Sequence, residues 1–438
     1  MEKTKVAIVG MGTVGSGVAR LLLDHGDRTA RHAGRTLWLE RVVVRDPGKA
    51  RDVDLPEGVM TTRLEDVLED PSIEVVAQLI GGLEPARTIM LQLLEAGKDI
   101  VTANKALLAE YGPELFDRAR ELGRSIAFEA SVAGGVPIIN CISQSLSANQ
   151  ITSLEAILNG TSNFIVTAME DIQADFETVV GEAQRLGLAE ADPTLDVDGS
   201  DAAQKLAILA HLAFGARVHW SDIPRQGIDQ LELADFNYAN QLGYRIKLIA
   251  VARLIESGLE LHVSPTLVRM FTPLAEVREA NNAVSVVGDA VGKVFFHGLG
   301  AGQMPTASAV VADMIDTAVG RTRITFKTLQ LWSDQEARVQ PADPKATRSR
   351  FYMRLDVLDE PGVLAQVTGV LGKHQISIAS VIQHGPAPDI QPGMTNWNVV
   401  PLIVMTHEAY EGAAADAIRE IEQLDSVRSH CVRMRVLD

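Results

Sequence analysis

The amino-acid sequence predicts an α/β protein with a doubly wound parallel sheet, an α+β domain built onto it and a small C-terminal βαββαβ domain. Short β-branched runs alternate with helical patterns up to about residue 140, and strands and helices mix less regularly from about 150 to 305. A polar, proline-containing stretch, residues 333–350, then precedes a differently patterned segment. The 438 residues are enough for about three domains.

The first 140 residues carry the parallel-sheet pattern. Runs such as Val6–Val9 have the β-branched composition of buried strands, and the helical runs between them repeat apolar residues every three to four positions. The elements expected in order are the strand Val6–Val9, a glycine-rich turn, the helix Ser16–His25, the strands Leu37–Val44 and Val75–Ile80, the helix Glu84–Ala96 and the strand Asp99–Ala103. In the middle region, Glu260–Pro265 is expected to be a strand.

The C-terminal segment begins with strict alternation. Apolar side chains at 351, 353, 355 and 357 alternate with Tyr352, Arg354 and Asp356, which predicts a half-buried strand. The elements expected after it are the helix Val363–Lys373, the strands Ile376–Gln383 and Trp397–Thr406, the helix Tyr410–Leu424 and the strand Val427–Val436. This order is that of a ferredoxin-like domain.

Composition excludes several classes of function. With 57 acidic and 40 basic residues the net charge is −17, which disfavours a nucleic-acid or anionic-membrane partner. The two cysteines, Cys141 and Cys431, and the ten histidines show no metal-ligand spacing. No apolar run approaches the roughly 20 residues that span a bilayer, and the early strand leaves no room for a signal peptide. We expect a soluble, cytoplasmic protein.

The glycine-rich turn predicts a dinucleotide site. Gly10, Gly12 and Gly15 are spaced as GxGxxG between a strand and a helix. The first glycine permits the tight turn, the second lets the backbone approach a pyrophosphate, and the third permits close packing of helix on strand. A Rossmann-type domain is therefore expected here.

The residue after the second strand bears on the choice of coenzyme. Many such strands end in an acidic residue that binds the adenosine ribose, whereas this one ends in Arg45, with Lys49 and Arg51 beyond. A guanidinium suits a 2′-phosphate and favours NADP(H), while Asp46 keeps NAD(H) open.

Two lysines are candidate catalytic groups. Lys105 follows the strand Asp99–Ala103, where ligands bind in open α/β sheets, although it could also be a surface lysine that starts a helix. Asp201 and Lys205 share one face of a helix that is apolar almost all round, so we expect the helix to be buried and its charges to face a cavity. Five carboxylates precede Lys205 in this segment: Glu190, Asp192, Asp196, Asp198 and Asp201.

Cys141 is a weaker candidate. The Asn140-Cys141 pair is similar to the thiol nucleophile of aldehyde dehydrogenases that form a thioester. Its apolar neighbours instead indicate a helix that packs on the core, where cysteine is an ordinary small hydrophobic residue.

Six motifs in chain order resemble those of homoserine dehydrogenase. They are Gly10-x-Gly12-x-x-Gly15, Val101-Thr-Ala-Asn-Lys105, Phe128-Glu-Ala-Ser-Val-Ala-Gly-Gly-Val-Pro137, Leu158-Asn-Gly-Thr-Ser-Asn163, the stretch Asp196–Lys205 and Gly298-Leu-Gly-Ala-Gly-Gln-Met-Pro-Thr306. The C-terminal unit, with Asp359-x-Pro-Gly-Val-Leu364, resembles an ACT domain. The domains expected are 1–140, completed by 305–330, for the coenzyme; 141–304 for catalysis and dimerisation; the linker 333–350; and the ACT domain 351–438.

The resemblance implies NAD(P)H-dependent, reversible reduction of L-aspartate 4-semialdehyde to L-homoserine, in the biosynthesis of threonine, methionine and isoleucine. It implies that Lys205 donates the proton, with Asp201 beside it and Lys105 near the nicotinamide. The substrate contacts it implies are Glu190, Asp196, Gly160, Thr161 and Lys205. The coenzyme contacts it implies are Gly10, Gly12, Thr13, Val14, Gly15, Arg45, Thr102, Lys105, Gly187 and Gly302.

The resemblance also implies a cation, an effector and an oligomer. Glu129 and the backbone oxygens of Val132, Gly134 and Val136 match a sodium site, and hard oxygen ligands suit such an ion. The ACT domain implies feedback inhibition, most often by L-threonine, with Asp359 and Gly362 as candidate contacts; Ser377 stands where many ACT domains have asparagine. A homodimer or homotetramer is expected.

The sequence leaves two other functions open. One is a thiol-dependent aldehyde dehydrogenase that acts through Cys141. The other is a catalytically inactive sensor of nucleotides and amino acids on the same fold, against which the presence of both Lys105 and Lys205 argues.

Overall fold

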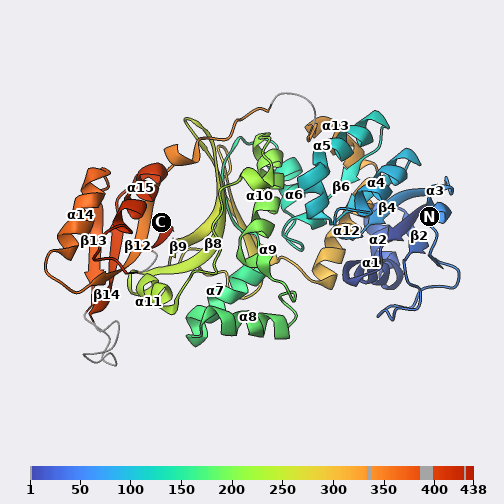
Figure 1. Ribbon diagram of the computed structural model, residues 1–438. Coiled ribbons are helices and arrows are strands. Elements are labelled where there is room, and N and C mark those ends of the chain that lie inside the picture. The colour runs from blue at the N-terminus through green and yellow to red at the C-terminus, as the bar shows by residue number, and fades with distance from the viewer. Residues whose placement is uncertain (1, 333–336, 385–397, 429–430) are drawn as a thin grey trace. The chain divides into compact units, whose positions relative to one another are not determined.

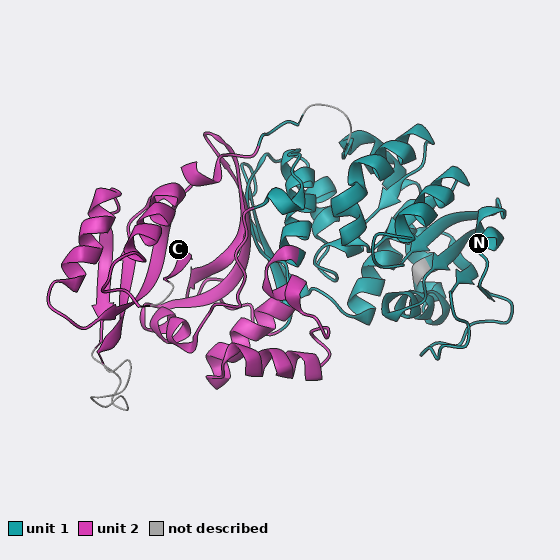
Figure 2. Ribbon diagram, viewed as in Figure 1, with its two compact units in different colours: residues 1–160, 201–223, 280–340 teal, residues 161–200, 224–279, 341–438 magenta. Residues whose placement is uncertain are grey.

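The computed structural model describes residues 2–332, 337–384, 398–428 and 431–438 (Figure 1). The chain divides into two compact units, each built from three stretches of sequence (Figure 2). The first unit comprises residues 1–160, 201–223 and 280–340, and the second comprises residues 161–200, 224–279 and 341–438.

A parallel sheet organises the first unit, in the strand order β3-β2-β1-β4-β5-β6. Its strands are β1 Lys3–Val9, β2 Thr36–Val43, β3 Met60–Thr61, β4 Ile73–Gln78, β5 Asp99–Thr102 and β6 Ile126–Ala127. The order reverses direction at β1, as in a doubly wound sheet, so the carboxyl ends of β1, β4 and β5 line one edge. The predicted fold class is confirmed for this part of the chain.

Helices cover both faces of this sheet (Figure 1). On one face α1 Thr13–Asp24, α2 Gly26–Ala33 and α12 Gln303–Ala318 pack together, and on the other lie α4 Ala86–Glu95 and α5 Lys105–Glu121. Helix α12 comes from far along the chain, yet its Ala307 shares one buried core cluster with Val18 of α1 and Ile8 of β1. Gly17 of α1 makes this close packing possible, because a Cβ at that position would lie only 2.9 Å from the Ala307 Cβ.

The rest of the first unit holds shorter elements and an antiparallel strand set, β11-β10-β7. These strands are β7 Ile151–Ile157, β10 Asn281–Gly288 and β11 Gly292–Leu299. The remaining helices are α3 Glu65–Leu68, the 3-10 turn Glu129–Ser131, α6 Ile138–Asn140, a π-helical turn Cys141–Ser145, α10 Ser200–Phe214, the 3-10 turn Trp220–Asp222 and α13 Arg321–Leu329.

The second unit contains a long hairpin, four helices and the C-terminal domain. The hairpin strands are β8 Tyr244–Ile255 and β9 Gly258–Arg269, and the helices are α7 Gly160–Ile172, α8 Phe176–Arg185, α9 Thr194–Val197 and α11 Leu233–Gln241. The C-terminal elements are β12 Arg348–Leu358, α14 Val363–Lys373, β13 Ile378–Gln383, β14 Val399–Thr406, β15 Ala409–Tyr410, α15 Glu411–Ile421 and β16 Val432–Leu437. Their βαββαβ order, with the strands arranged β16-β12-β14-β13, confirms the predicted ferredoxin-like topology.

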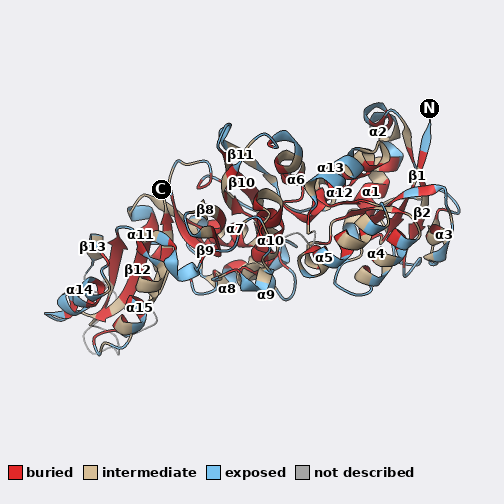
Figure 3. Ribbon diagram, turned by 90° about the horizontal axis from the view of Figure 1, so that it is seen from above, coloured by how far each residue is buried: buried red, intermediate tan, exposed pale blue. Residues whose placement is uncertain are grey.

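The C-terminal domain shares a sheet with the hairpin. Its last strand, β16, pairs in parallel with β9, in the register Arg435 to Thr266 through Leu437 to Val268. The sheet of the second unit therefore runs β8-β9-β16-β12-β14-β13, and the strands β9 and β12 are mostly buried (Figure 3).

The prediction that β12 is half-buried is wrong. Phe351, Met353 and Leu355 face the core formed with α14 and α15, as expected. Tyr352 and Arg354, on the opposite face, are also buried, at 0% and 3% exposure. They contact Asp235 of α11, so a helix far away in the sequence covers the face that the alternation predicts to be exposed.

Part of the predicted linker is structured. A 3-10 turn spans Pro344–Ala346, and β12 begins at Arg348. Residues 333–336 of that stretch, and Trp397 at the start of a predicted strand, lie outside the described residues. Within the described residues, no helix has both the length and the apolar character needed to cross a bilayer.

Candidate active site

The glycine-rich turn connects β1 to α1 and has the geometry of a dinucleotide site. Gly10 has φ of +101°, and its N–H donates to the Val43 carbonyl. A Cβ at Gly15 would lie 2.2 Å from the Gly10 carbonyl oxygen, so that position requires glycine. A Cβ at Gly12 would enter open space, which leaves room for a phosphate group.

The first turn of α1, which includes Thr13 and Val14, can accept an anion. Among the described residues no side chain caps this helix, and its first turn carries no acidic residue. Its N–H groups and the positive end of its dipole are thus available to a pyrophosphate. Arg51 reinforces the turn, because its Nε donates to the Met11 carbonyl at 3.3 Å.

Arg45 lies just beyond the carboxyl end of β2, and its side chain is exposed. The neighbouring Asp46 is engaged locally, since its side chain accepts from Gly48 N and its carbonyl accepts from Arg51. In dinucleotide-binding folds the residue at this end of the second strand is the one that commonly contacts the coenzyme's ribose.

Lys105 is the first residue of α5, and Asn104 fixes the start of that helix. The Asn104 side chain accepts from Leu107 N and donates to the carbonyls of Ile80 and Gly82, in the loop after β4. Thr102, at the end of β5, is buried and donates to Gln78. These contacts hold Lys105 at the carboxyl edge of the parallel sheet, where the sequence predicted it.

One buried carboxylate joins the two predicted lysines. Asp201 Oδ1 lies 3.0 Å from Lys105 Nζ, and its Oδ2 lies 2.7 Å from Lys205 Nζ. The Asp201 and Lys205 side chains are only 8% and 11% exposed, whereas that of Lys105 is 37% exposed. Helix α10 is buried along most of its length, as the sequence predicted.

Electrostatics keep this carboxylate charged. Burial by itself would raise the pKa of Asp201, but Lys205 and Lys105 outweigh burial and hold that pKa below its usual range. The cluster therefore presents two ammonium groups around one fixed anion, an arrangement able to hold a carbonyl oxygen and deliver a proton to it.

Sequence reasoning missed two groups that orient Lys205. Asn159 Nδ2 donates to Asp201 Oδ2 at 2.8 Å, and Lys205 Nζ donates to the Leu158 carbonyl at 2.7 Å. Asn159 belongs to the motif Leu158–Asn163, in which the resemblance implies roles only for Gly160 and Thr161. The Leu158 contact involves only the backbone, so no residue type signals it.

Glu190, Asp196 and Thr161, three further candidate substrate residues, belong to the second unit, whereas Gly160 is the last residue of the first stretch of the first unit. Glu190 is exposed, and Asp196 is half-buried in α9. Thr161, next to Gly160 at the start of α7, donates to the Leu188 carbonyl, and Gly187 turns the chain after α8 with φ of +72°. Two further acidic residues of this segment have local roles, since Asp198 accepts from Ser200, and Asp192 accepts from Thr194.

Gly302 precedes α12 in the first unit. It has φ of +120°, and its carbonyl accepts from Thr306 N, so the glycine ends the loop and starts the helix.

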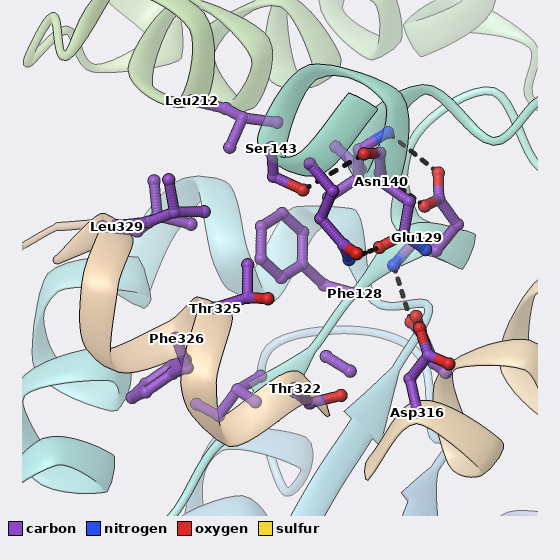
Figure 4. A pocket seen from close by; sticks show the side chains of 16 residues that line it. Phe128, Glu129, Asn140, Ser143, Leu212, Asp316, Thr322, Thr325, Phe326 and Leu329 are labelled. Atoms are coloured by element: carbon purple, nitrogen blue, oxygen red, sulfur yellow. Dashed lines mark hydrogen bonds between the residues drawn. The ribbon is translucent and has the colours of Figure 1, made fainter. Parts of the chain in front are cut away.

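Glu129 lines a small pocket in the first unit (Figure 4). Its Oε1 accepts from Ile139 N and its Oε2 from Asn140 N, while its own N–H donates to Asp313. Burial raises the pKa of Glu129 to about 7, and burial followed by repulsion from Glu129 raises the pKa of Asp313.

The predicted sodium ligands follow Glu129 in a tight loop. Gly134 has φ of +47°, and a Cβ there would lie 2.3 Å from the Gly300 carbonyl oxygen. The Val136 carbonyl accepts from Ile138 N, and Val132 is fully buried. An oxygen-only donor set of this kind fits a monovalent cation chemically. The described residues contain no group of three or more His, Cys, Asp or Glu side chains suited to a metal ion.

Cys141 starts the π-helical turn beside Glu129 and is partly buried. Burial, followed by the Glu129 charge, raises the pKa of its thiol. A thiol with a raised pKa is a poor nucleophile, because the thiolate is the reactive form.

The candidate effector residues lie in the C-terminal domain. Asp359 accepts from Gln383 of β13, and Gly362 precedes α14 with φ of +95°. The Ser377 carbonyl accepts from His407 N, a contact that uses only its backbone.

Comparisons with known proteins show the family to which the chain is similar. Family models match over residues 10–129 (homoserine dehydrogenase, NAD binding domain), 137–315 (homoserine dehydrogenase) and 351–423 (ACT domain). A homoserine dehydrogenase of Pseudomonas aeruginosa is 43% identical, covering 100% of this chain and 99% of the relative. The crystal structure of a homoserine dehydrogenase from Thiobacillus denitrificans is 43% identical with a TM-score of 0.91, covering 100% of this chain and 99% of that one.

A hyperthermophilic archaeal homoserine dehydrogenase in complex with NADPH is 26% identical, with a TM-score of 0.59, and covers 72% of this chain and 97% of that one. The chain therefore belongs to the homoserine dehydrogenase family of nicotinamide-dependent oxidoreductases and carries a C-terminal ACT domain.

Proposed function

We propose that the protein reduces L-aspartate 4-semialdehyde to L-homoserine with NADPH, reversibly, as a step in the biosynthesis of threonine, methionine and isoleucine. The observation that carries the proposal is the buried Asp201 carboxylate held between Lys105 and Lys205 at the carboxyl edge of a dinucleotide-binding sheet.

Lys205 serves as the proton donor. A nicotinamide coenzyme held at the glycine-rich turn would supply the hydride that the aldehyde carbon needs. The Lys205 ammonium gives a proton to the carbonyl oxygen, so that the aldehyde would become a primary alcohol. Asp201 and the Leu158 carbonyl hold the ammonium in place. In the reverse direction the neutral amine accepts the hydroxyl proton. Lys105, the more exposed of the two lysines, stabilises the negative charge that develops on the oxygen.

Coenzyme binding uses the turn Gly10–Gly15, Thr102, Gly187 and Gly302. Arg45 selects NADPH by pairing with the 2′-phosphate, which the exposed guanidinium beyond β2 supports. The NADPH complex of the archaeal relative supports the same preference.

Substrate recognition uses carboxylates for the amino group. Glu190 and Asp196 bind the ammonium of the amino acid, and the Gly160-Thr161 backbone borders the reacting end, assignments that the matched family motifs support.

A cation, an effector and self-association complete the proposal. Glu129 and the carbonyls of Val132, Gly134 and Val136 bind a monovalent cation, for which Na⁺ is the ion to test. The ACT domain binds L-threonine through the region of Asp359 and Gly362 and lowers activity. The protein works as a homodimer or homotetramer in the cytoplasm.

The decisive test is oxidation of reduced coenzyme, followed by its absorbance, with L-aspartate 4-semialdehyde as substrate. Turnover with NADPH above that with NADH supports the reaction and the role of Arg45. Repeating the assay with L-threonine, and with choline in place of Na⁺, tests the effector and the cation. Folded protein that turns over neither coenzyme contradicts the proposal and favours the inactive sensor.

A further inference from the structure

Asn282 of β10 holds the same carbonyl that holds the proposed proton donor. Its Nδ2 donates to the Leu158 carbonyl oxygen at 3.0 Å, and Lys205 Nζ donates to that oxygen at 2.7 Å. Leu158 directly follows β7, and β10 pairs with β7 at Ala283 and Ile157, so the sheet itself brings Asn282 and Leu158 together. The Leu158 oxygen thereby accepts from two donors at once.

The surrounding backbone is shaped around this amide. Asn282 is 1% exposed. A Cβ at Gly300 would lie 2.0 to 2.3 Å from the atoms of the Asn282 amide, and a Cβ at Gly160 would lie 3.4 Å from its Oδ1. Gly300 therefore leaves the space that the amide occupies, whereas a Cβ at Gly160 would only reach ordinary contact with it.

The two polar atoms of the Asn282 amide differ in their hydrogen bonding. Asn282 Oδ1 is buried and, among the described residues, makes no hydrogen bond. A buried acceptor without a partner is unfavourable. The contribution of this side chain must therefore come from its donor, and that donor points to the carbonyl that orients Lys205.

We infer that Asn282 is a positioning residue for Lys205. It fixes the Leu158 carbonyl, which in turn fixes the Lys205 ammonium beside Asp201 at the distance that proton transfer requires. The inference rests on the proposed role of Lys205 as proton donor. Without Asn282 the Leu158 peptide can rotate away, the ammonium is less well placed, and proton transfer slows while coenzyme binding is unaffected.

The test compares Asn282→Ala and the isosteric Asn282→Asp, whose carboxylate cannot donate to Leu158. Ser285→Ala is the matched control, because Ser285 lies on the same strand, is 1% exposed and has an Oγ without a partner among the described residues. Misplacement of a catalytic group costs up to about 100-fold, so we expect kcat to fall about 10- to 100-fold in both Asn282 variants. The NADPH dissociation constant should stay at the wild-type value, and Ser285→Ala should keep wild-type kcat.

The solvent deuterium isotope effect on kcat distinguishes a specific slowing of proton transfer from a general loss of structure in the site. It should increase in both Asn282 variants, because proton transfer becomes slower relative to the other steps. Wild-type kcat and isotope effect in both variants would overturn the inference, as would equal losses in Ser285→Ala. Lys205→Ala tests the proposed function separately from the role of Asn282. If Lys205→Ala keeps the wild-type rate, the proposed role of Lys205 as proton donor is wrong, whatever the Asn282 variants do. In the Lys205→Ala background, Asn282→Ala should cause no further loss.

Discussion

Each unit of the protein buries an aspartate against cations, and the two arrangements differ. In the first unit Asp201 lies between two lysine ammonium groups, one of which is 37% exposed. In the second unit Asp235 is fully buried and binds the Arg354 guanidinium through two contacts, at 2.8 and 3.2 Å, and the Tyr352 hydroxyl at 3.1 Å.

The two arrangements use cations of different chemistry. A guanidinium is planar, always charged and matched to a carboxylate in a fixed geometry, whereas an ammonium can gain or lose a proton near neutral pH when its surroundings favour it. Burial by itself would lower the pKa of Arg354, but Asp235 outweighs burial and raises it. Asp235 therefore joins α11 to the C-terminal sheet through a group that stays charged, whereas Asp201 lies between two groups of a kind that can exchange protons.

The largest expected effect belongs to Lys205. Lys205→Ala should lower kcat about 10²- to 10⁴-fold, the usual contribution of a positioned acid or base. Steady-state kinetics with NADPH measure the loss, and unchanged NADPH binding shows that the site remains folded. A rate within a few-fold of wild type would remove Lys205 from the mechanism.

The corresponding change at the other aspartate should affect stability and leave the chemistry unchanged. Asp235→Ala leaves Arg354 buried without its main partner, which typically costs about 3–5 kcal/mol. Chemical denaturation measures this cost. The double variant Asp235→Leu/Arg354→Met should recover most of it, since an apolar pair of similar volume avoids burying charge. If the single variant lost kcat without losing stability, the contrast between the two aspartates would be wrong.

His211 provides a buried polar group in the first unit that is not assigned to catalysis. Its Nε2 accepts from Trp332 N, its Nδ1 donates to the Ala216 carbonyl, and burial lowers its pKa from 6.5 to about 4. The unfolded chain therefore binds a proton between pH 6.5 and 4 that the folded protein does not, and stability falls as the pH drops through that range.

The shift from 6.5 to about 4 corresponds to about 3 kcal/mol at pH 4. Denaturation of wild type and His211→Gln at several pH values measures it, because glutamine can make both hydrogen bonds but does not titrate. Parallel pH dependence of the two proteins would show that His211 is not held neutral.

Arg45 should affect only the choice of coenzyme. Loss of one hydrogen bond to a charged group costs about 1.5 kcal/mol or more, so Arg45→Ala should raise the KM for NADPH about tenfold. The KM for NADH should not change. Arg63→Ala, another exposed arginine of the first unit, is the control for a general charge effect. An equal rise with both coenzymes would argue against contact with the 2′-phosphate.

The smallest effect is expected at Cys141. Cys141→Ser should keep wild-type kcat, since burial raises the pKa of the thiol and disfavours the reactive thiolate. Loss of several orders of magnitude in kcat would instead support the thiol-dependent aldehyde dehydrogenase.

Local patterns were enough to select three residues that the structure brings together. The GxGxxG spacing, the lysine after β5 and the Asp201–Lys205 spacing each depend on a few neighbouring residues, and the structure joins Lys105, Asp201 and Lys205 around one carboxylate. Patterns do not show contacts between distant segments. The burial of Tyr352 depends on Asp235, more than 100 residues away, and the roles of Leu158 and Asn282 depend on a backbone carbonyl and on strand pairing.

The pairing of β16 with β9 has a consequence for protein engineering. A chain shortened before β16 would expose the β9 edge with unpaired backbone N–H and C=O groups, and such edges promote aggregation. Replacing the sensor with one from another protein would therefore require a final strand able to pair with Thr266–Val268, in addition to a matching linker. The final strand of the chain thus covers an edge of the hairpin β8-β9, a role independent of any effector.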